Sequence, residues 1–341
     1  MTHPHEGRGR PALRRLGLGW GTALLSLMLA LAPMDTFAAP AKAQASAKAK
    51  AKKVAKAKTH KVAQAKKRTV AAAPKKVVLA RKPAPLPASP DKLPLEASVA
   101  YVIDQQTREV LFSRNDDEVR PIASLTKLMT GLIVNDAGLP LDQQLSITGD
   151  DVDTLKHSSS RLKVGTELTR RQALHLALMS SENRAAHALA RTYPGGVPAF
   201  VSAMNIKARQ LGMDQTQYVD PTGLSSRNRS SARDLAILAA AAYKRPLLRK
   251  YSTSPGYQLA VDGGSLRYVN SNGLVRAGQW NIGLQKTGYI SEAGQCLLVQ
   301  TRVDGRNLIM VFLDSATKVT RLRDAETVKR WIRAYGDDDK G

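Results

Sequence analysis

A serine followed three residues later by a lysine can form an activated nucleophile, because one helical turn puts both side chains on the same face. A neutral lysine amine can then take the proton of the serine hydroxyl. The chain has four such pairs, at Ser89/Lys92, Ser124/Lys127, Ser160/Lys163 and Ser315/Lys318. Only Ser124/Lys127 opens a stretch with the apolar spacing of a buried helix, so these two residues are the candidate nucleophile and base.

A serine two residues before an asparagine forms a second candidate. The chain contains Ser181-Glu182-Asn183 and Ser226-Arg227-Asn228. The first lies between two apolar stretches with helical spacing, so it can present a hydroxyl and an amide from a junction between buried helices. The second precedes a helix that we expect to begin near Ser231, and we predict that it caps that helix.

The third candidate is Lys286-Thr287-Gly288, which occurs once in the chain and lies on a predicted strand. A cation and a hydroxyl on one strand can hold a carboxylate. Gly288 would let a substrate backbone approach closely, because it has no side chain. The following amide, that of Tyr289, can then point into the site and stabilise a developing negative charge.

Other hydrolase chemistries lack their residues here. The chain has no His-Glu-x-x-His run and no Gly-x-Ser-x-Gly turn. His157, His175 and His187 lack the carboxylate spacing of a zinc site, so we expect no metal and no cofactor. Cys296 is the only cysteine, which excludes an intramolecular disulfide, and its apolar neighbours predict a buried strand thiol.

The spacing of the apolar residues predicts the elements that must carry these groups. We predict strands over residues 98–103, 109–112, 282–290, 295–303 and 307–313, and helices over residues 124–134, 168–191, 231–243 and 319–334. Two strands, a helical middle, three further strands and a closing helix predict an α+β domain, with helices packed on an antiparallel sheet.

Charge and composition divide the chain unevenly. The formal net charge is +24, yet residues 40–90 hold fifteen Lys or Arg and no Asp or Glu, whereas residues 91–341 hold 33 basic and 26 acidic residues. Residues 1–38 combine arginines, an apolar run and a small-residue cleavage site, which is typical of a secretory signal peptide. A retained membrane anchor is the alternative, although the run is short and broken by glycines.

We therefore predict four segments. They are a signal peptide over residues 1–38, a disordered basic linker over residues 39–93, a catalytic domain over residues 94–335 and a short polar tail over residues 336–341.

The three motifs, in this order, are the set found in penicillin-binding proteins and class A β-lactamases. Residues 121–130, Pro-Ile-Ala-Ser-Leu-Thr-Lys-Leu-Met-Thr, resemble the active-site helix of low-molecular-mass penicillin-binding proteins, the D-alanyl-D-alanine carboxypeptidase and endopeptidase family. Residues 220–224 and 270–274 resemble other segments of that family. The resemblance covers residues 97–313 and implies a serine β-lactamase/DD-peptidase-like fold, an antiparallel sheet of about five strands covered by helices plus a helical subdomain.

The resemblance also implies catalytic roles. Ser124 would be the nucleophile and Lys127 its base, kept neutral by burial and by the nearby positive charge of Lys286. Ser181 would pass the proton on to the leaving amine. Water would then release the acyl-enzyme.

Further residues would bind the substrate. Asn183 would bind the peptide backbone, and Lys286 and Thr287 would bind the terminal carboxylate. Gly288 would leave room for the substrate beside the strand. The backbone amides of Ser124 and Tyr289 would form the oxyanion hole.

Within the family, residues 179–186 look closest to the DD-endopeptidase branch, called penicillin-binding protein seven, because carboxypeptidases more often carry glycine in place of Glu182. We therefore expect hydrolysis of D-alanyl-containing cross-links in peptidoglycan, and trimming of pentapeptide stems by a carboxypeptidase is the alternative. A class A β-lactamase would need a glutamate between the second and third motifs, and the chain has none from Arg184 to Gln285. A fourth reading is an inert envelope-binding protein whose linker makes the contacts.

These readings imply a location and partners. We expect an exported, periplasmic protein whose partners are peptidoglycan peptide stems, with β-lactam antibiotics as covalent inhibitors. The linker is similar in composition to nucleic-acid-binding tails, but a signal peptide argues against nucleic acid. It would instead contact anionic membrane or envelope surfaces, or act as a solvated spacer without a specific partner.

Overall fold

The computed structural model describes Ser89 and residues 92–335. The predicted signal peptide, most of the predicted linker and the polar tail lie outside the described residues. No helix within the described part is long and apolar enough to cross a membrane.

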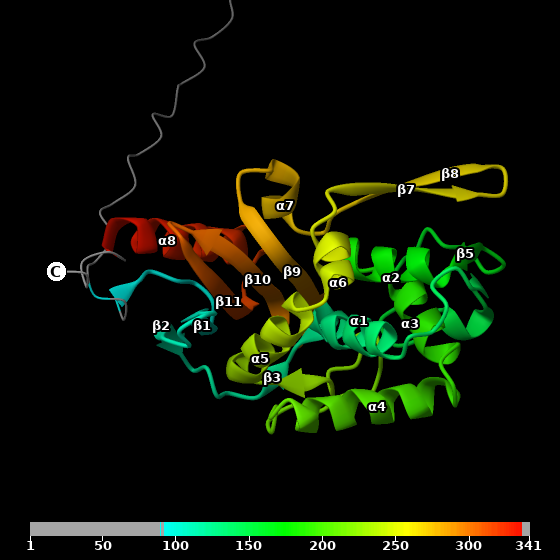
Figure 1. The fold of residues 1–341 in the computed structure, drawn as a ribbon, viewed down its shortest axis with the longest axis horizontal. Coiled ribbons are helices and arrows are strands. Elements are labelled where there is room, and N and C mark those ends of the chain that lie inside the picture. Colours follow the sequence, from blue (N-terminus) through cyan, green and yellow to red (C-terminus); the bar gives the residue numbers. More distant parts are fainter. Residues whose placement is uncertain (1–88, 90–91, 336–341) are drawn as a thin grey trace, which may run out of the picture. The chain divides into compact units, whose positions relative to one another are not determined.

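A five-stranded antiparallel sheet forms the centre of the described residues (Figure 1). Across the sheet the strands lie in the order β2 (Val110–Arg114), β1 (Val99–Asp104), β11 (Arg306–Ser315), β10 (Gly294–Val303) and β9 (Asn281–Ile290). The hairpin at the start of the domain joins the C-terminal meander where β1 pairs with β11, with Val99 opposite Leu313. The structure confirms the predicted sheet and places β9, which carries the Lys-Thr-Gly motif, at one edge.

Helices cover both faces of the sheet, which explains the uninterrupted apolar runs of its strands. Successive side chains of a strand point to opposite faces. In β10, Leu297 and Val299 join the cluster under α8 (Lys318–Tyr335), whereas Leu298 joins the cluster on the side of α5 (Ala232–Tyr243). The sheet thus separates two apolar layers, as the predicted α+β domain requires.

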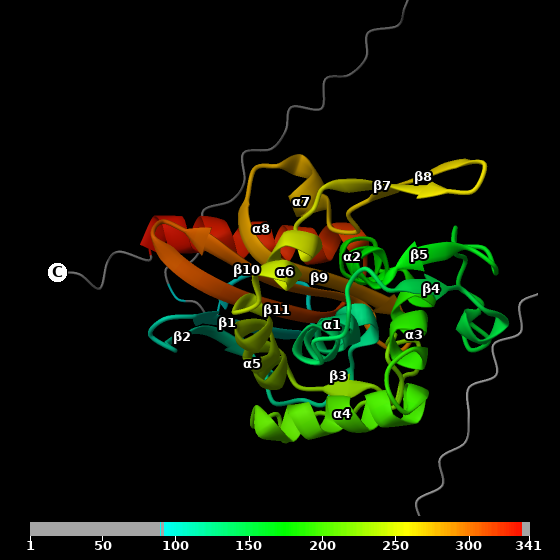
Figure 2. The same cartoon turned by 45° about the vertical axis from the view of Figure 1, so that its right-hand side comes forward.

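A helical subdomain packs beside the sheet (Figure 2). It contains α1 (Lys127–Asp136), α2 (Arg170–Met179), α3 (Asn183–Arg191) and α4 (Gly196–Gln210), with α6 (Pro246–Ser252) next to α1 and α2. Eight of the ten residues of α1 are buried, so this helix is the centre of the subdomain. The remaining short elements are β3 (Arg120–Pro121), η2 (Ala123–Thr126), β4 (Gln144–Ser146), η3 (Gly149–Asp151), β5 (Glu167–Thr169), β6 (Arg229–Ser230) and α7 (Gly273–Ala277).

Two predicted helices differ from the structure. The helix predicted to start at Ser124 begins as a 3₁₀ turn, η2, and becomes an α-helix only at Lys127. The helical region predicted over residues 168–191 is two helices, α2 and α3. Between them Ser181 has a φ of +65°, a left-handed conformation that an α-helix cannot contain.

Two further elements, α4 and the hairpin of β7 (Gly256–Val261) and β8 (Gly264–Val269), are absent from the elements predicted from the apolar spacing. The hairpin projects from the body of the domain above α2 and β5 (Figure 1). Its signal was present in the sequence, because apolar residues alternate at Tyr257, Leu259 and Val261 before the turn sequence Asp262-Gly263-Gly264.

Candidate active site

The 3₁₀ turn η2 presents Ser124 next to Lys127. Side chains three residues apart eclipse one another in a 3₁₀ turn. The Lys127 amine donates a hydrogen bond to the Ser124 hydroxyl, with 2.9 Å between Nζ and Oγ. The pair predicted from sequence is therefore in direct contact.

Lys127 is completely buried, and its amine has two further acceptors. It donates to Oδ1 of Asn183 at 2.7 Å and to the backbone carbonyl of Thr222 at 2.6 Å. Burial lowers the pKa of Lys127 to about 7, although the carboxylates of Asp220 and Glu182 act in the opposite direction. A lysine with a pKa near 7 is poised to act as a base at neutral pH.

Ser181 meets a second amine. Its left-handed backbone lies at the break between α2 and α3, and its hydroxyl accepts a hydrogen bond from Nζ of Lys286 at 2.9 Å. Lys286 is also completely buried, and burial together with the positive charges of Lys127 and Arg321 holds its pKa well below the ordinary value.

Lys127 and Lys286 are both buried, and burial is the largest cause of the low pKa of each amine. The positive charge of Lys127 also lowers the pKa of Lys286. Because repulsion between two amines is mutual, the contribution of Lys286 to the low pKa of Lys127 stays a prediction.

The edge strand β9 runs close beside η2. A Cβ added to Gly288 would lie 3.0 Å from the backbone nitrogen of Ser124 and 3.0 Å from Cβ of Ala123, so a side chain at this position would press on the turn. Gly288 thus lets the strand approach the nucleophile. The Tyr289 side chain, 58% exposed, follows it on the strand.

Two polar contacts of the site were not predicted. The Thr287 hydroxyl donates to the Ser271 hydroxyl at 2.8 Å, and Nδ2 of Asn183 donates to Oγ of Ser158 at 2.8 Å. Ser271 lies within residues 270–274, which the resemblance had marked without assigning a role. Ser158 carries no local pattern, so no signal in the sequence distinguished it.

Residues 219–222 pack next to Lys127, and Asn228 holds the start of this segment in place. Oδ1 of Asn228 accepts from the backbone amides of Val219 and Asp220, and its Nδ2 donates to the hydroxyl of Thr126 at 3.1 Å. The prediction that the second Ser-x-Asn caps a helix is therefore wrong. Ser231 caps α5, whereas the buried side chain of Asn228 connects Val219 and Asp220 to Thr126 of η2.

The remaining candidates have partners other than the catalytic candidates. Among residues 89 and 92–335 no group of three His, Cys, Asp or Glu side chains could hold a metal ion. His175 stacks on Tyr251, and His187 contacts the carboxylate of Asp151 through Nδ1. Cys296 is confirmed as a buried strand thiol, and burial raises its pKa to about 11.

Comparisons with known proteins agree with this geometry. The sequence pattern of the peptidase S11 family, described as D-alanyl-D-alanine carboxypeptidase, matches residues 86–317. A D-alanyl-D-alanine endopeptidase of Pseudomonas aeruginosa is 46% identical over 74% of this chain and 83% of its own length. One of Escherichia coli K12 is 43% identical over 68% of this chain and 76% of its own length.

A solved structure shows the same fold. The crystal structure of the Streptomyces K15 DD-transpeptidase matches 70% of this chain and 98% of its own chain, with 28% identity and a TM-score of 0.65. The family match, the identity to these relatives and the contacts around Ser124 lead to one conclusion. The chain belongs to the D-alanyl-D-alanine carboxypeptidase family and is a serine-type D-alanyl-D-alanine peptidase.

Proposed function

We propose that the protein is a DD-endopeptidase that hydrolyses D-alanyl-containing peptide cross-links of peptidoglycan through an acyl-enzyme on Ser124. The observation that carries the proposal is the convergence of two serine–amine contacts, Ser124 with Lys127 and Ser181 with Lys286, each 2.9 Å long. The names of the Pseudomonas and Escherichia relatives support endopeptidase rather than carboxypeptidase activity.

Acylation begins at Ser124. Lys127, with a pKa of about 7, takes the hydroxyl proton as the oxygen attacks the carbonyl carbon of the D-alanyl residue. The bond between that carbon and the leaving nitrogen then breaks. Ser181, held by Lys286, is placed to pass a proton to the leaving amine.

Other groups hold the substrate in place. Asn183 binds the peptide backbone, and Lys286 and Thr287 bind the carboxylate of the leaving residue. The amides of Ser124 and Tyr289 stabilise the oxyanion, and Gly288 makes room for that approach. Water then attacks the ester and releases Ser124.

A β-lactam would acylate the same serine. Because no glutamate lies between Arg184 and Gln285, the chain lacks the residue that activates the deacylating water in class A β-lactamases. We therefore expect a long-lived penicilloyl-enzyme.

Two purified substrates test the proposal. A cross-linked muropeptide dimer and a monomeric pentapeptide are digested separately, with Ser124→Ala as the inactive control, and the products are separated by chromatography. An endopeptidase consumes the dimer faster than it releases D-alanine from the pentapeptide. The opposite order would make the protein a carboxypeptidase, and rapid turnover of penicillin would make it a β-lactamase.

The protein would act in the periplasm, exported by residues 1–38, with the basic residues 40–90 contacting anionic membrane or envelope surfaces. Deletion of residues 40–90 should then reduce binding to vesicles with anionic lipid headgroups at low salt while penicillin labelling persists. Equal vesicle binding by the full and shortened chains would identify the segment as a spacer.

A further inference from the structure

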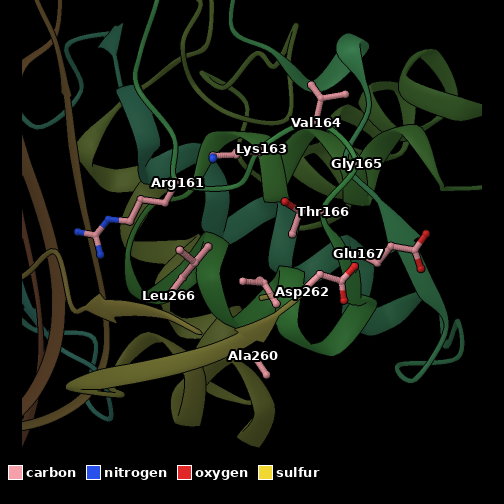
Figure 3. A pocket seen from close by; sticks show the side chains of 10 residues that line it. Arg161, Lys163, Val164, Gly165, Thr166, Glu167, Ala260, Asp262 and Leu266 are labelled. Atoms are coloured by element: carbon pink, nitrogen blue, oxygen red, sulfur yellow. The ribbon is translucent and has the colours of Figure 1, made fainter. Parts of the chain in front are cut away.

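Two cavities lie along the β7–β8 hairpin, and the inner one reaches the residues that flank Ser181. The inner cavity, of about 310 Å³, is lined by Ser180 and Glu182 on either side of Ser181, and by Tyr268 at the end of β8. The outer cavity, of about 590 Å³, lies between residues 161–167 and the hairpin (Figure 3). Arg161 lines both cavities, so they are neighbours along the hairpin, and we call the two together the path.

The contact between Ser271 and Thr287 relates the inner cavity to the part of the site that would bind the leaving residue. Val269 lines the inner cavity, and two residues later Ser271 contacts the Thr287 hydroxyl. The backbone amide of Ser271 also donates to the carbonyl of Met179, at the end of α2. A single residue, Asn270, thus separates Val269 of the inner cavity from Ser271, which contacts Thr287, and in the proposed function Thr287 binds the carboxylate of the leaving residue. This chain connection favours a position of the cavities on the leaving-group side of the scissile bond.

Arg161 is held in place without an ion pair. Its guanidinium lies over the ring of Tyr268, 5.2 Å from the centroid, and donates a hydrogen bond to the backbone carbonyl of Arg267. No carboxylate of the described residues forms a salt bridge with it. A guanidinium has five N–H donors, so Arg161 keeps donors for a ligand in either cavity.

The path is not a general surface for anions. Figure 3 shows Arg161 at one end of the outer cavity and Glu167 at the other, with Lys163 and Asp262 between them. A peptide presents both carboxylates and backbone N–H donors, so charges of both signs suit a peptide better than a simple anion. Arg161 is the positive side chain that lines the inner cavity beside Ser181.

We propose that these cavities bind the leaving peptide of a cross-linked substrate, and that Arg161 binds a carboxylate of that peptide beyond the one held by Lys286 and Thr287. This inference rests on the proposed endopeptidase function. When the leaving group is a single amino acid, its only carboxylate is already bound by Lys286 and Thr287. A leaving peptide reaches further and carries additional carboxylates, for which Arg161 offers a fixed, bidentate partner.

Matched leaving groups test this assignment. Two cross-linked peptide dimers are prepared that are identical except that the distal carboxylates of the leaving peptide are free in one and converted to carboxamides in the other. The kcat/KM of hydrolysis is measured for both, with active enzyme titrated by covalent penicillin labelling. We expect the wild type to prefer the free carboxylates by about tenfold, the effect of one charge-assisted contact at a partly exposed site.

Variants of Arg161 test whether this side chain causes the preference for free carboxylates. Arg161→Met should reduce the ratio of the two kcat/KM values to near one, and Arg161→Gln, which keeps a donor for the Arg267 carbonyl, should do the same if Arg161→Met folds poorly. Arg209→Met removes an exposed positive charge from α4, which lies on the opposite side of the subdomain from the hairpin, and should keep the wild-type ratio (Figures 1 and 2).

The outcomes separate the two proposals. If the wild type hydrolyses both dimers equally well, or if Arg161→Gln keeps the preference, Arg161 does not bind the leaving peptide and the inference is overturned. If the wild type hydrolyses neither dimer yet releases D-alanine from a pentapeptide, the endopeptidase function itself fails.

Discussion

The active site contains two serine–lysine contacts of the same length but of different origin. Ser124 and Lys127 are three residues apart and meet within one turn, whereas Ser181 and Lys286 are 105 residues apart and meet only because β9 lies beside the break between α2 and α3. The first contact needs local backbone geometry, and the second needs the whole domain. In the proposed function the local pair provides the nucleophile and its base, and the long-range pair provides the groups that act on the leaving amine and the carboxylate.

The largest expected effect separates the two pairs. Ser124→Ala removes the nucleophile and should abolish covalent labelling by a fluorescent penicillin, a loss of at least about a thousandfold. Ser181→Ala keeps the nucleophile and its base, so labelling should persist but slow by about a hundredfold, the contribution of one positioned proton-transfer group. Equal loss in both variants would mean that the two pairs act as one unit.

A substitution where β9, which carries Lys286, packs against η2, which carries Ser124, should have the next largest effect. Gly288→Ala brings a methyl group to 3.0 Å from the Ser124 nitrogen and should slow acylation by about tenfold or more through displacement of η2. Gly149→Ala is the control, because a Cβ there meets nothing within 4 Å. Stopped-flow acylation rates at equal active-enzyme concentration would show the difference, and a wild-type rate in Gly288→Ala would contradict the close packing.

The pH dependence of acylation should report on the local pair. Lys127 acts as a base only when neutral, and its pKa is about 7, so the acylation rate should rise through pH 7 and fall about tenfold per unit well below it. Glu182→Gln removes a carboxylate that raises this pKa, so its profile should move to lower pH. A profile that does not change between pH 5 and pH 9 would exclude Lys127 as the titrating base.

The smallest effect should come from the contact that supports the long-range pair. Ser271→Ala removes the oxygen that faces the Thr287 hydroxyl and should raise KM for a peptide substrate about three- to fivefold, with little change in kcat. Ser265→Ala, on the exposed part of β8, serves as the matched control. A fall in kcat with unchanged KM would place Ser271 in the chemistry rather than in binding.

Short sequence motifs predicted the structure correctly where the interacting residues are neighbours in the chain. The spacing of Ser124 and Lys127, the start of a helix near Ser231 and the apolar run around Cys296 are confirmed, since each depends on neighbours within one helical turn or one strand. The second Ser-x-Asn shows the limit. Asn228 has the residue type of a helix cap, yet its side-chain amide connects Val219 and Asp220 to Thr126 of η2, which lies 102 residues earlier in the chain.

The sequence by itself determined which residue types are available, the five strands of the central sheet, the helical regions of α1, α2, α3, α5 and α8, and the family, because periodicity and short motifs are encoded along the chain. Only the tertiary structure decided that Thr222 and Asn183 accept hydrogen bonds from Lys127, and that burial lowers its pKa. It also decided that Arg161 lines two neighbouring cavities, of which the inner one reaches the residues that flank Ser181. Desolvation and contacts between distant segments arise from packing in three dimensions, and no spacing along the chain records them.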